Sequence, residues 1–223
     1  MKYNMKNNIV LQAILMVTLI FTFGVNKSFS QVTDIDGNTY KTVTIDTQVW
    51  MAENLNVEHY RNGDVIPQVK DIDKWNNLTT GTWCYYENKT ENGTTYGKLY
   101  NWYAVTDTRG LAPEGWHVST DDDWTILTDY LGGKDIAGGK LKTTELWESP
   151  NKGATNEIGF SVLPAGFRLY GNFVYIGMYA CFWSSLEVDY DEAWYRMLNN
   201  RGLDVYRNFD YKVNGLSVRC VKD

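Results

Sequence analysis

Residues 120–133 read TDDDWTILTDYLGG, and this stretch carries the clearest secondary-structure signal in the chain. Thr120 and the three aspartates after it have the form of a capping box, in which side chains satisfy the first free N–H groups of a helix. The aspartates also lie where the helix dipole favours negative charge. Trp124, Leu127 and Leu131 follow at spacings of three and four, and two glycines end the pattern. The stretch therefore predicts a helix that begins at Thr120. An aspartate triplet can also bind calcium, but capping accounts for all three acids.

Short strands and turns are predicted on both sides of this helix. Before it, residues 32–54 form two strands around the Asp36-Gly37-Asn38 turn, and residues 82–86 and 98–105 form a strand and a helical turn between long loops. After it, a second short helix is expected at 140–144, and strands are expected at 159–164, 173–175, 179–184, 193–198, 203–207 and 216–221. The sequence Asn199-Asn200-Arg201-Gly202 predicts a hairpin turn between two of these strands. Nine Trp and sixteen Tyr favour an irregular, β-rich fold.

The first thirty residues have the pattern of a secretory signal peptide. Lys2 and Lys6 precede a short apolar run, and Ser28 and Ser30 are small residues two apart, as signal peptidase requires. The apolar run is shorter than the ~20 residues that a membrane-spanning helix needs, and no later segment is comparable. We expect residues 1–30 to be a cleaved signal peptide, Gln31 to be the mature N-terminus, and the protein to be secreted or held at the cell surface, with no membrane-spanning segment after cleavage.

The charge of the chain excludes some classes of partner. Removal of residues 1–30 takes away three lysines and no acids, so the net charge moves from −6 to −9. An acidic chain with scattered cations argues against nucleic acid and anionic lipid as partners. The two histidines, His59 and His117, lie far apart, and the three cysteines have no metal-ligand spacing. No metal and no cofactor are therefore expected.

Several blocks of the sequence resemble one protein family. They are Asp34–Tyr40, Gln48–Leu55, Tyr96–Tyr103, Gly115–Thr120, Asn156–Phe160, Phe182–Ser185 and Ser217–Val221. Together they resemble the Fibrobacter succinogenes major paralogous domain, a family abundant in exported proteins of Bacteroidota and Fibrobacterota. The resemblance implies one domain over residues 31–223. It also implies an α+β, C-type-lectin-like fold near the formylglycine-generating enzymes, irregular and loop-rich, with short antiparallel β-sheets and one or two helices.

Catalytic chemistry is not indicated by the residues. The chain lacks the paired cysteines of a formylglycine-generating enzyme and the Glu-Pro-Asn or Gln-Pro-Asp motif of a calcium-dependent lectin. The acids Asp189, Asp191 and Glu192 are read as solvated loop residues, and His117 is read as a structural imidazole that hydrogen-bonds a loop. We expect no catalytic residues and no enzymatic activity, because fold alone does not transfer chemistry.

A set of aromatic and basic residues in the late strands is the candidate binding site. Aromatic faces stack on sugar rings, and arginine supplies hydrogen bonds. The candidate residues are Tyr170, Trp183, Tyr195, Arg196, Tyr206 and Arg207, with Arg168 and Arg219 nearby in the sequence. The same pattern arises where arginines stack on tyrosines to complete a sheet. Both interpretations stay open at this point.

The three cysteines are Cys84, Cys181 and Cys220. Relatives often carry cysteines at positions equivalent to Ala112 and near Gly93. This chain has no cysteine at either position, so the resemblance indicates no disulfide partner for Cys220 or Cys84. Cys181 and Cys220 alternate with apolar residues on strands, and each is expected to face inward. We therefore expect at most one disulfide, between Cys181 and Cys220, with Cys84 free.

The resulting functional hypothesis is an exported, non-enzymatic cell-envelope or secreted protein that acts as a surface binding or adhesion module. Its partner is a carbohydrate or another surface protein. The alternatives are a structural subunit of an envelope assembly and, less favoured, an enzyme of formylglycine-generating ancestry.

Overall fold

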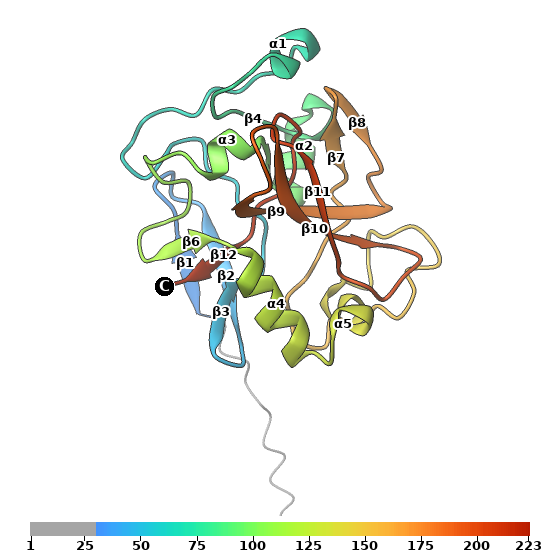
Figure 1. The fold of residues 1–223 in the computed structure, drawn as a ribbon. Coiled ribbons are helices and arrows are strands. Elements are labelled where there is room, and N and C mark those ends of the chain that lie inside the picture. Colours follow the sequence, from blue (N-terminus) through green and yellow to red (C-terminus); the bar gives the residue numbers. More distant parts are fainter. Residues whose placement is uncertain (1–29) are drawn as a thin grey trace, which may run out of the picture.

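The computed structural model describes residues 30–223. Within that range it shows a mixed α+β architecture of several short antiparallel sheets and few helices (Figure 1). Except for Ser30, the predicted signal peptide lies outside the described residues. No helix among residues 30–223 has the length and apolar character needed to cross a bilayer.

The largest sheet joins segments from both ends of the described chain. Its strands lie in the order β1 (Gln31–Thr33), β2 (Thr39–Ile45), β3 (Gln48–Met51), β12 (Cys220–Lys222) and β6 (Trp116–Val118). All neighbours are antiparallel, and Val221 pairs with Trp50 on one side and with His117 on the other. The residues closest to the C-terminus therefore fill the gap between β3 and β6.

The predicted helix is confirmed as α4 (Asp121–Tyr130), which follows β6 directly. The Thr120 hydroxyl accepts the N–H of Asp123, and the Asp123 carboxylate accepts the N–H of Thr120, so both halves of the capping box are present. Trp124 and Leu127 are buried on its inner face, and Gly132 and Gly133 follow with positive φ, as a helix C-terminus favours.

The expected second helix at residues 140–144 is wrong in its position. The helix is α5 (Lys134–Leu141), and its interior contains Gly138 and Gly139. A Cβ on Gly138 would lie 2.6 Å from the carbonyl oxygen of Leu203. The glycines therefore allow two backbones to pack closely, whereas the sequence pattern alone treats them as a helix break.

The second sheet lies above α4 and α5 in Figure 1 and carries most of the candidate residues. Its order is β11 (Tyr206–Tyr211), β10 (Glu192–Asn199) and β9 (Tyr179–Glu187), and both pairings are antiparallel. The predicted hairpin is confirmed, but β11 begins three residues later than expected, because residues 200–205 form the connection. β9 is also bridged to Gly166 and Ser217, so only β11 is an edge strand.

Smaller elements complete the structure. They are α1 (Ile72–Asn76), β4 (Trp83–Cys84), a 3₁₀ helix η1 (Tyr86–Asn88), α2 (Thr90–Tyr96), β5 (Leu99–Tyr100), α3 (Trp102–Val105), β7 (Phe167–Leu169) and β8 (Asn172–Val174). The pairs β4–β5 and β7–β8 are two-stranded antiparallel sheets. The strand expected at 159–164 is only a single bridge between Val162 and Lys142, and that expected at 216–221 is regular only from Cys220.

Candidate functional site

The six residues predicted to bind a ligand do not lie together on one surface. Trp183, Tyr195 and Arg196 are 0%, 7% and 3% exposed. The other three, Tyr170, Tyr206 and Arg207, are exposed, but each contacts a different part of the molecule. The interpretation of this set as one ligand-binding face is therefore incorrect for its buried half.

Trp183 and Tyr195 are core residues. Their rings meet edge to face with centroids 6.2 Å apart, and Nε1 of Trp183 donates to the carbonyl oxygen of Tyr100 at 2.9 Å. β9 has backbone hydrogen-bond partners along both edges, because it pairs with β10 and Trp183 also donates its N–H to Ser217. Both rings lie within the hydrophobic core, so neither is available to a ligand.

Arg196 and Arg207 attach this sheet to the beginning of α4. Nη2 of Arg196 lies 2.8 Å from Oδ1 of Asp121, and Nε of Arg207 lies 2.8 Å from Oδ2 of the same carboxylate. The Arg207 guanidinium carbon also lies 3.3 Å from the centroid of the Trp194 ring. Burial lowers the pKa of Arg196, and Asp121 opposes that shift. Both arginines therefore serve a structural contact.

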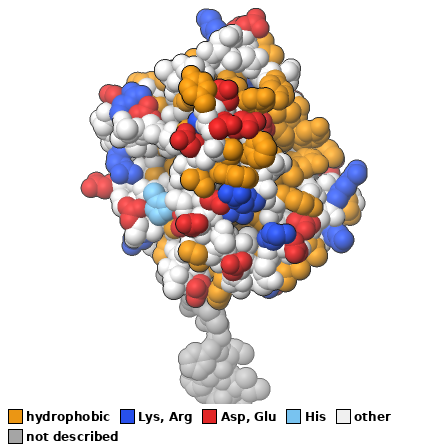
Figure 2. All heavy atoms as spheres, viewed as in Figure 1, with side chains coloured by type: hydrophobic (Ala, Val, Ile, Leu, Met, Phe, Trp, Pro, Cys, Tyr) orange, Lys and Arg blue, Asp and Glu red, His pale blue; other side chains and the backbone are white. Residues whose placement is uncertain are grey.

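Tyr206 belongs to an open groove at the end of the β10–β11 hairpin, with a volume of about 390 Å³. Besides Tyr206, which is 41% exposed, its lining includes the ring of Tyr179 and the charged residues Asp135, Lys152, Arg201 and Asp204. In Figure 2, Lys and Arg side chains stand at the right edge, where Figure 1 places this hairpin connection. The groove combines aromatic rings with charged and amide groups.

A buried lysine holds the backbone of the groove in place. Nζ of Lys142 donates to the carbonyl oxygens of Asn199, Gly202 and Lys152 at 2.9, 2.9 and 3.0 Å. Asn199 adds a side-chain turn, because its Oδ1 accepts the N–H groups of Arg201 and Gly202. Burial lowers the pKa of Lys142 to about 8. Its ammonium group therefore remains mostly charged at neutral pH beneath the groove.

The charged groups of the groove differ in whether they have partners. The Asp135 carboxylate pairs with Lys134 at 2.6 Å, and the Asp204 carboxylate accepts the Tyr206 hydroxyl at 3.1 Å. In contrast, the side chains of Arg201 and Lys152 make no hydrogen bond or ion pair within residues 30–223. The groove thus presents two cations that are available to a ligand.

A row of exposed aromatic side chains, the β11 aromatic row, lies on the other face of the same hairpin. The rings of Trp194 and Phe209 meet edge to face at 5.6 Å, and those of Tyr170 and Tyr211 lie 5.8 Å apart. Phe209, Tyr211 and Tyr170 are 46%, 42% and 54% exposed. Figure 2 shows hydrophobic side chains gathered over this part of the molecule, with acidic side chains among them.

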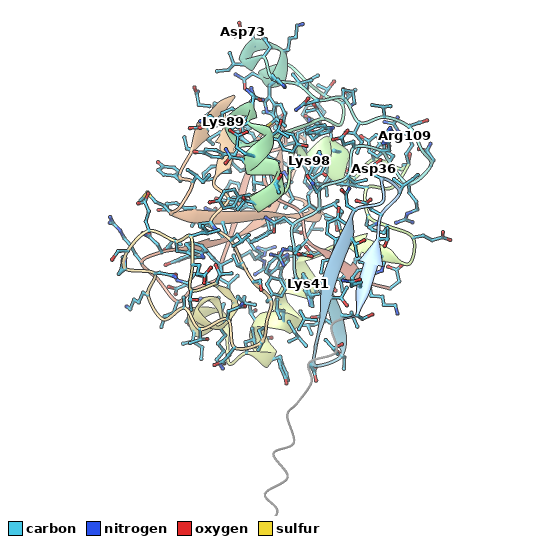
Figure 3. The ribbon with its side chains drawn as sticks, turned by 180° about the vertical axis from the view of Figure 1, so that it is seen from behind. Asp36, Lys41, Asp73, Lys89, Lys98 and Arg109 are labelled. Carbon is cyan, nitrogen blue, oxygen red and sulfur yellow. The ribbon has the colours of Figure 1, made fainter. Side chains whose placement is uncertain are left out.

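A second concave surface lies on the opposite side of the molecule, with a volume of about 420 Å³. Its aromatic lining residues are Trp83 and Tyr85, but Nζ of Lys98 lies 4.5 and 5.1 Å from the centroids of these two rings. Figure 3 shows Lys98 and Asp36 on this side. Because the buried ammonium already covers the ring faces, this cleft is less suited to stacking than the groove.

The possible catalytic groups named by the sequence are engaged in structural hydrogen bonds. Nδ1 of His117 lies 2.7 Å from Asp223, and its Nε2 lies 3.0 Å from Asp123, so both ring nitrogens have partners. In the β9–β10 turn, Oδ1 of Asp189 accepts the N–H groups of the next two acids, Asp191 and Glu192. Across residues 30–223, no group of three or more His, Cys, Asp or Glu side chains is arranged to hold a metal ion.

Comparison with protein-family models gives a match over residues 43–222, to the Fibrobacter succinogenes major domain. The chain belongs to this family. The match confirms the resemblance expected from the sequence blocks. No curated protein and no solved structure matches the chain significantly.

The sequence blocks typical of the Fibrobacter succinogenes major domain meet around one buried arginine. Nε of Arg219 donates to Oδ1 of Asn54, and its Nη atoms donate to the carbonyl oxygens of Met51, Phe160 and Ser161 at 2.8 to 3.0 Å. Its guanidinium carbon lies 4.8 Å from the ring centroid of Phe160. Three of the blocks, together with Ser161 at the border of one of them, thus share this one side chain.

Arg168 has the same role in another part of this domain. It is buried, its guanidinium carbon lies 4.2 Å from the Trp75 ring centroid, and it donates to the carbonyl oxygens of Val69, Lys70 and Gly171. Arg168 and Arg219 are consequently internal cross-links between loops. Neither is available for a ligand.

All three cysteines are free and buried in the structure, so the expected Cys181–Cys220 disulfide is not formed. Phe182 bridges Ser217 in parallel, which places Cys181 level with Leu216. Cys220 lies further along the chain, on β12 of the five-stranded sheet, whereas Cys181 lies on β9 of the second sheet. Inward orientation was correctly expected, but the two thiols lie on strands of different sheets and are not bonded.

The groove contains functional candidates that the sequence reasoning missed. Only Tyr206 of its lining was in the predicted set, and Tyr179, Lys152 and Arg201 were not. The predicted hairpin turn at residues 199–202 was the available clue. It places an arginine in an exposed loop, and exposed loops often carry functional residues. The contribution of Lys152 depends on a contact across about fifty residues and has no local signal.

Proposed function

We propose that this protein is an exported, non-enzymatic module of the cell surface that binds carbohydrate in the groove beside the β10–β11 hairpin. The observation that carries the proposal is the combination of two aromatic rings, Tyr179 and Tyr206, with partnerless Lys152 and Arg201 side chains in one open groove. Export is proposed from the basic and apolar start of the sequence.

The groove has the chemistry that sugars require. The apolar C–H face of a sugar ring stacks on tyrosine, and its hydroxyl groups need donors and acceptors at fixed positions. Tyr206 is half exposed, and its hydroxyl is oriented by Asp204. The Tyr179 ring is held by Tyr175, with centroids 5.0 Å apart. Rings fixed by such contacts lose little side-chain entropy when a ligand binds.

The architecture and the absence of catalysis are part of the same proposal. A C-type-lectin-like fold accommodates long, irregular loops between short strands, and the family blocks are consistent with that arrangement. The bonded state of both His117 nitrogens supports a non-enzymatic role, because a general base needs a free nitrogen next to its substrate.

A glycan array probed with the purified protein tests the proposal. Tyr206→Ala should lower the affinity for each bound glycan by about tenfold, which is the value of one aromatic stacking contact. Tyr130→Ala is the matched control, because Tyr130 is 59% exposed on α4 and does not line the groove. Equal binding by the two variants, or binding of no glycan, would refute the proposal.

The β11 aromatic row favours a second candidate function, that of a subunit in a surface assembly. Phe209, Tyr211 and Tyr170 form an exposed apolar row, and such rows commonly mark protein interfaces. Sedimentation of the purified protein over a range of concentrations tests this candidate. Self-association that Phe209→Ser abolishes would support it, and a monomer at all concentrations would count against it.

A further inference from the structure

We propose that the groove selects glycans that carry a carboxylate, the uronic-acid class, and that Arg201 and Lys152 bind that carboxylate. This inference rests on the proposed carbohydrate-binding function and adds the chemical class of the ligand. Its basis is the unequal pairing of charges around one groove.

The acids of the groove are already engaged, whereas two of its cations are not. Asp135 pairs with Lys134, and Asp204 accepts the hydroxyl of Tyr206. Arg201 and Lys152 have no side-chain partner among residues 30–223. The two acids and two cations of the lining balance, whereas the whole chain carries a net charge of −6, so the groove is less acidic than the chain as a whole.

The backbone of the groove adds to its preference for anions. Three carbonyl oxygens, those of Asn199, Gly202 and Lys152, point at the buried ammonium group of Lys142. They are therefore not presented to a ligand, and they do not repel its negative charge. The Lys142 ammonium group supplies a third positive charge directly beneath the floor.

A carboxylate on a pyranose ring satisfies these features together. The planar guanidinium of Arg201 can donate two parallel hydrogen bonds to one carboxylate, and Lys152 can donate from a second direction. The sugar ring carrying that carboxylate would stack on Tyr206, which lines the same groove. A neutral sugar would leave both cations without a partner.

The test compares charged sugars with neutral derivatives of the same sugars. Isothermal titration calorimetry at low salt measures binding to the purified protein. The ligands are trimers of galacturonate, glucuronate and mannuronate, and the methyl esters of these trimers. At least one free acid should bind about tenfold more tightly than its ester, and raising the salt should weaken only the acid. Arg201→Gln and Lys152→Gln should each reduce the ratio of the two affinities to below about threefold.

Lys41→Gln is the control variant. It removes one positive charge from an exposed position on β2, which belongs to a different sheet from the hairpin that forms the groove (Figure 3). This variant should keep the full preference for the acid. If Lys41→Gln loses the preference as well, the effect is one of net charge and the inference is wrong.

The remaining outcomes separate this inference from the proposed function. Equal affinity for acids and esters would overturn the carboxylate preference and leave carbohydrate binding intact. Tighter binding of a sulfated trisaccharide than of any uronate would also overturn the carboxylate preference. The groove would then recognise negative charge alone and not the geometry of a carboxylate. Binding of no glycan, charged or neutral, would overturn both.

Discussion

Nε of Arg219 donates a hydrogen bond of 2.7 Å to Oδ1 of Asn54, and this bond joins residues 165 positions apart in the sequence. The same guanidinium donates to three further carbonyl oxygens in loops. Burial lowers its pKa to about 9, so it stays charged at neutral pH. A side chain with this many acceptors should be one of the most sensitive positions of the domain.

Replacement of Arg219 by lysine should therefore destabilise the protein by about 3 kcal/mol, because one ammonium group cannot reach all four acceptors and leaves buried carbonyls unpaired. Urea unfolding followed by tryptophan fluorescence measures the change. Arg201→Lys, at an exposed and partnerless position, should stay within about 0.5 kcal/mol of the parent. Equal urea midpoints for Arg219→Lys and Arg201→Lys would show that the buried hydrogen bonds of Arg219 contribute little to stability.

His117 should make stability depend on pH. Desolvation lowers the pKa of His117, but its hydrogen bonds to Asp223 and Asp123 outweigh this effect, and the net shift is upward. A histidine whose pKa is raised in the folded state stabilises fully below the unfolded pKa of about 6.5, and this contribution is lost as pH rises through the folded value. The imidazole is 38% exposed, so solvent screening keeps the effect small.

The stability difference between the parent and His117→Asn should accordingly be larger near about pH 5.5 than near about pH 8.5. Urea midpoints at the two pH values measure this difference, and NMR titration gives the imidazole pKa directly. A measured pKa below that of a free histidine would contradict the structure at this position.

Two side chains protect the edge of the β9–β11 sheet. The N–H of Phe209 donates to Oδ1 of Asn208, and the N–H of Tyr211 donates to Oδ1 of Asp210. In an antiparallel pair, alternate residues direct their N–H groups away from the neighbouring strand, so these two amides belong to the open edge. Their use by the preceding side chains removes two donors that another strand would need.

The double variant Asn208→Ala, Asp210→Ala should therefore self-associate at concentrations where the parent does not. Light scattering after size-exclusion chromatography measures the change in mass. Asn77→Ala, an exposed position in the C-cap of α1, is the control and should behave like the parent. Unchanged mass in the double variant would show that the edge is protected by other means.

The thiols should be unreactive in the folded protein. Burial raises the pKa of Cys84 to about 12, and it also raises the pKa of Cys181 and Cys220. Because only the thiolate attacks, a thiol reagent should label none of the three before unfolding and all three afterwards. A peptide map with a bridge between Cys181 and Cys220 would contradict the structure at these positions.

Local signals in the sequence predicted the structure well where a few neighbouring residues decide it. The capping box at Thr120 is such a case, because both of its hydrogen bonds lie within four residues. The β10–β11 hairpin is another. Trp183 shows the limit: it was assigned to the ligand-binding set, but its ring is fully buried and its Nε1 donates to the carbonyl oxygen of Tyr100. That contact joins distant parts of the chain and has no local signal.

The candidate site was harder to predict than the fold. The sequence selected arginines for their closeness to tyrosines, and Arg196 and Arg207 instead bind Asp121 of the capped helix. The two partnerless cations, Arg201 and Lys152, come from two loops that Lys142 and the hydrogen bond from the N–H of Lys152 to Asn200 hold together. Whether a side chain is available to a ligand depends on the partners it already has. Closeness in the sequence does not reveal those partners.

The position of β12 sets an order on the folding of this chain. The strand lies between β3 and β6 in the five-stranded sheet, where Val221 separates Trp50 from His117. β3 and β6 have no direct pairing, so neither can complete its hydrogen bonds until residues 220–222 arrive. A chain synthesised from its N-terminus would therefore stay open until the end of the domain is available. Under the export proposed above, such late closure would suit passage of the unfolded chain through a narrow channel.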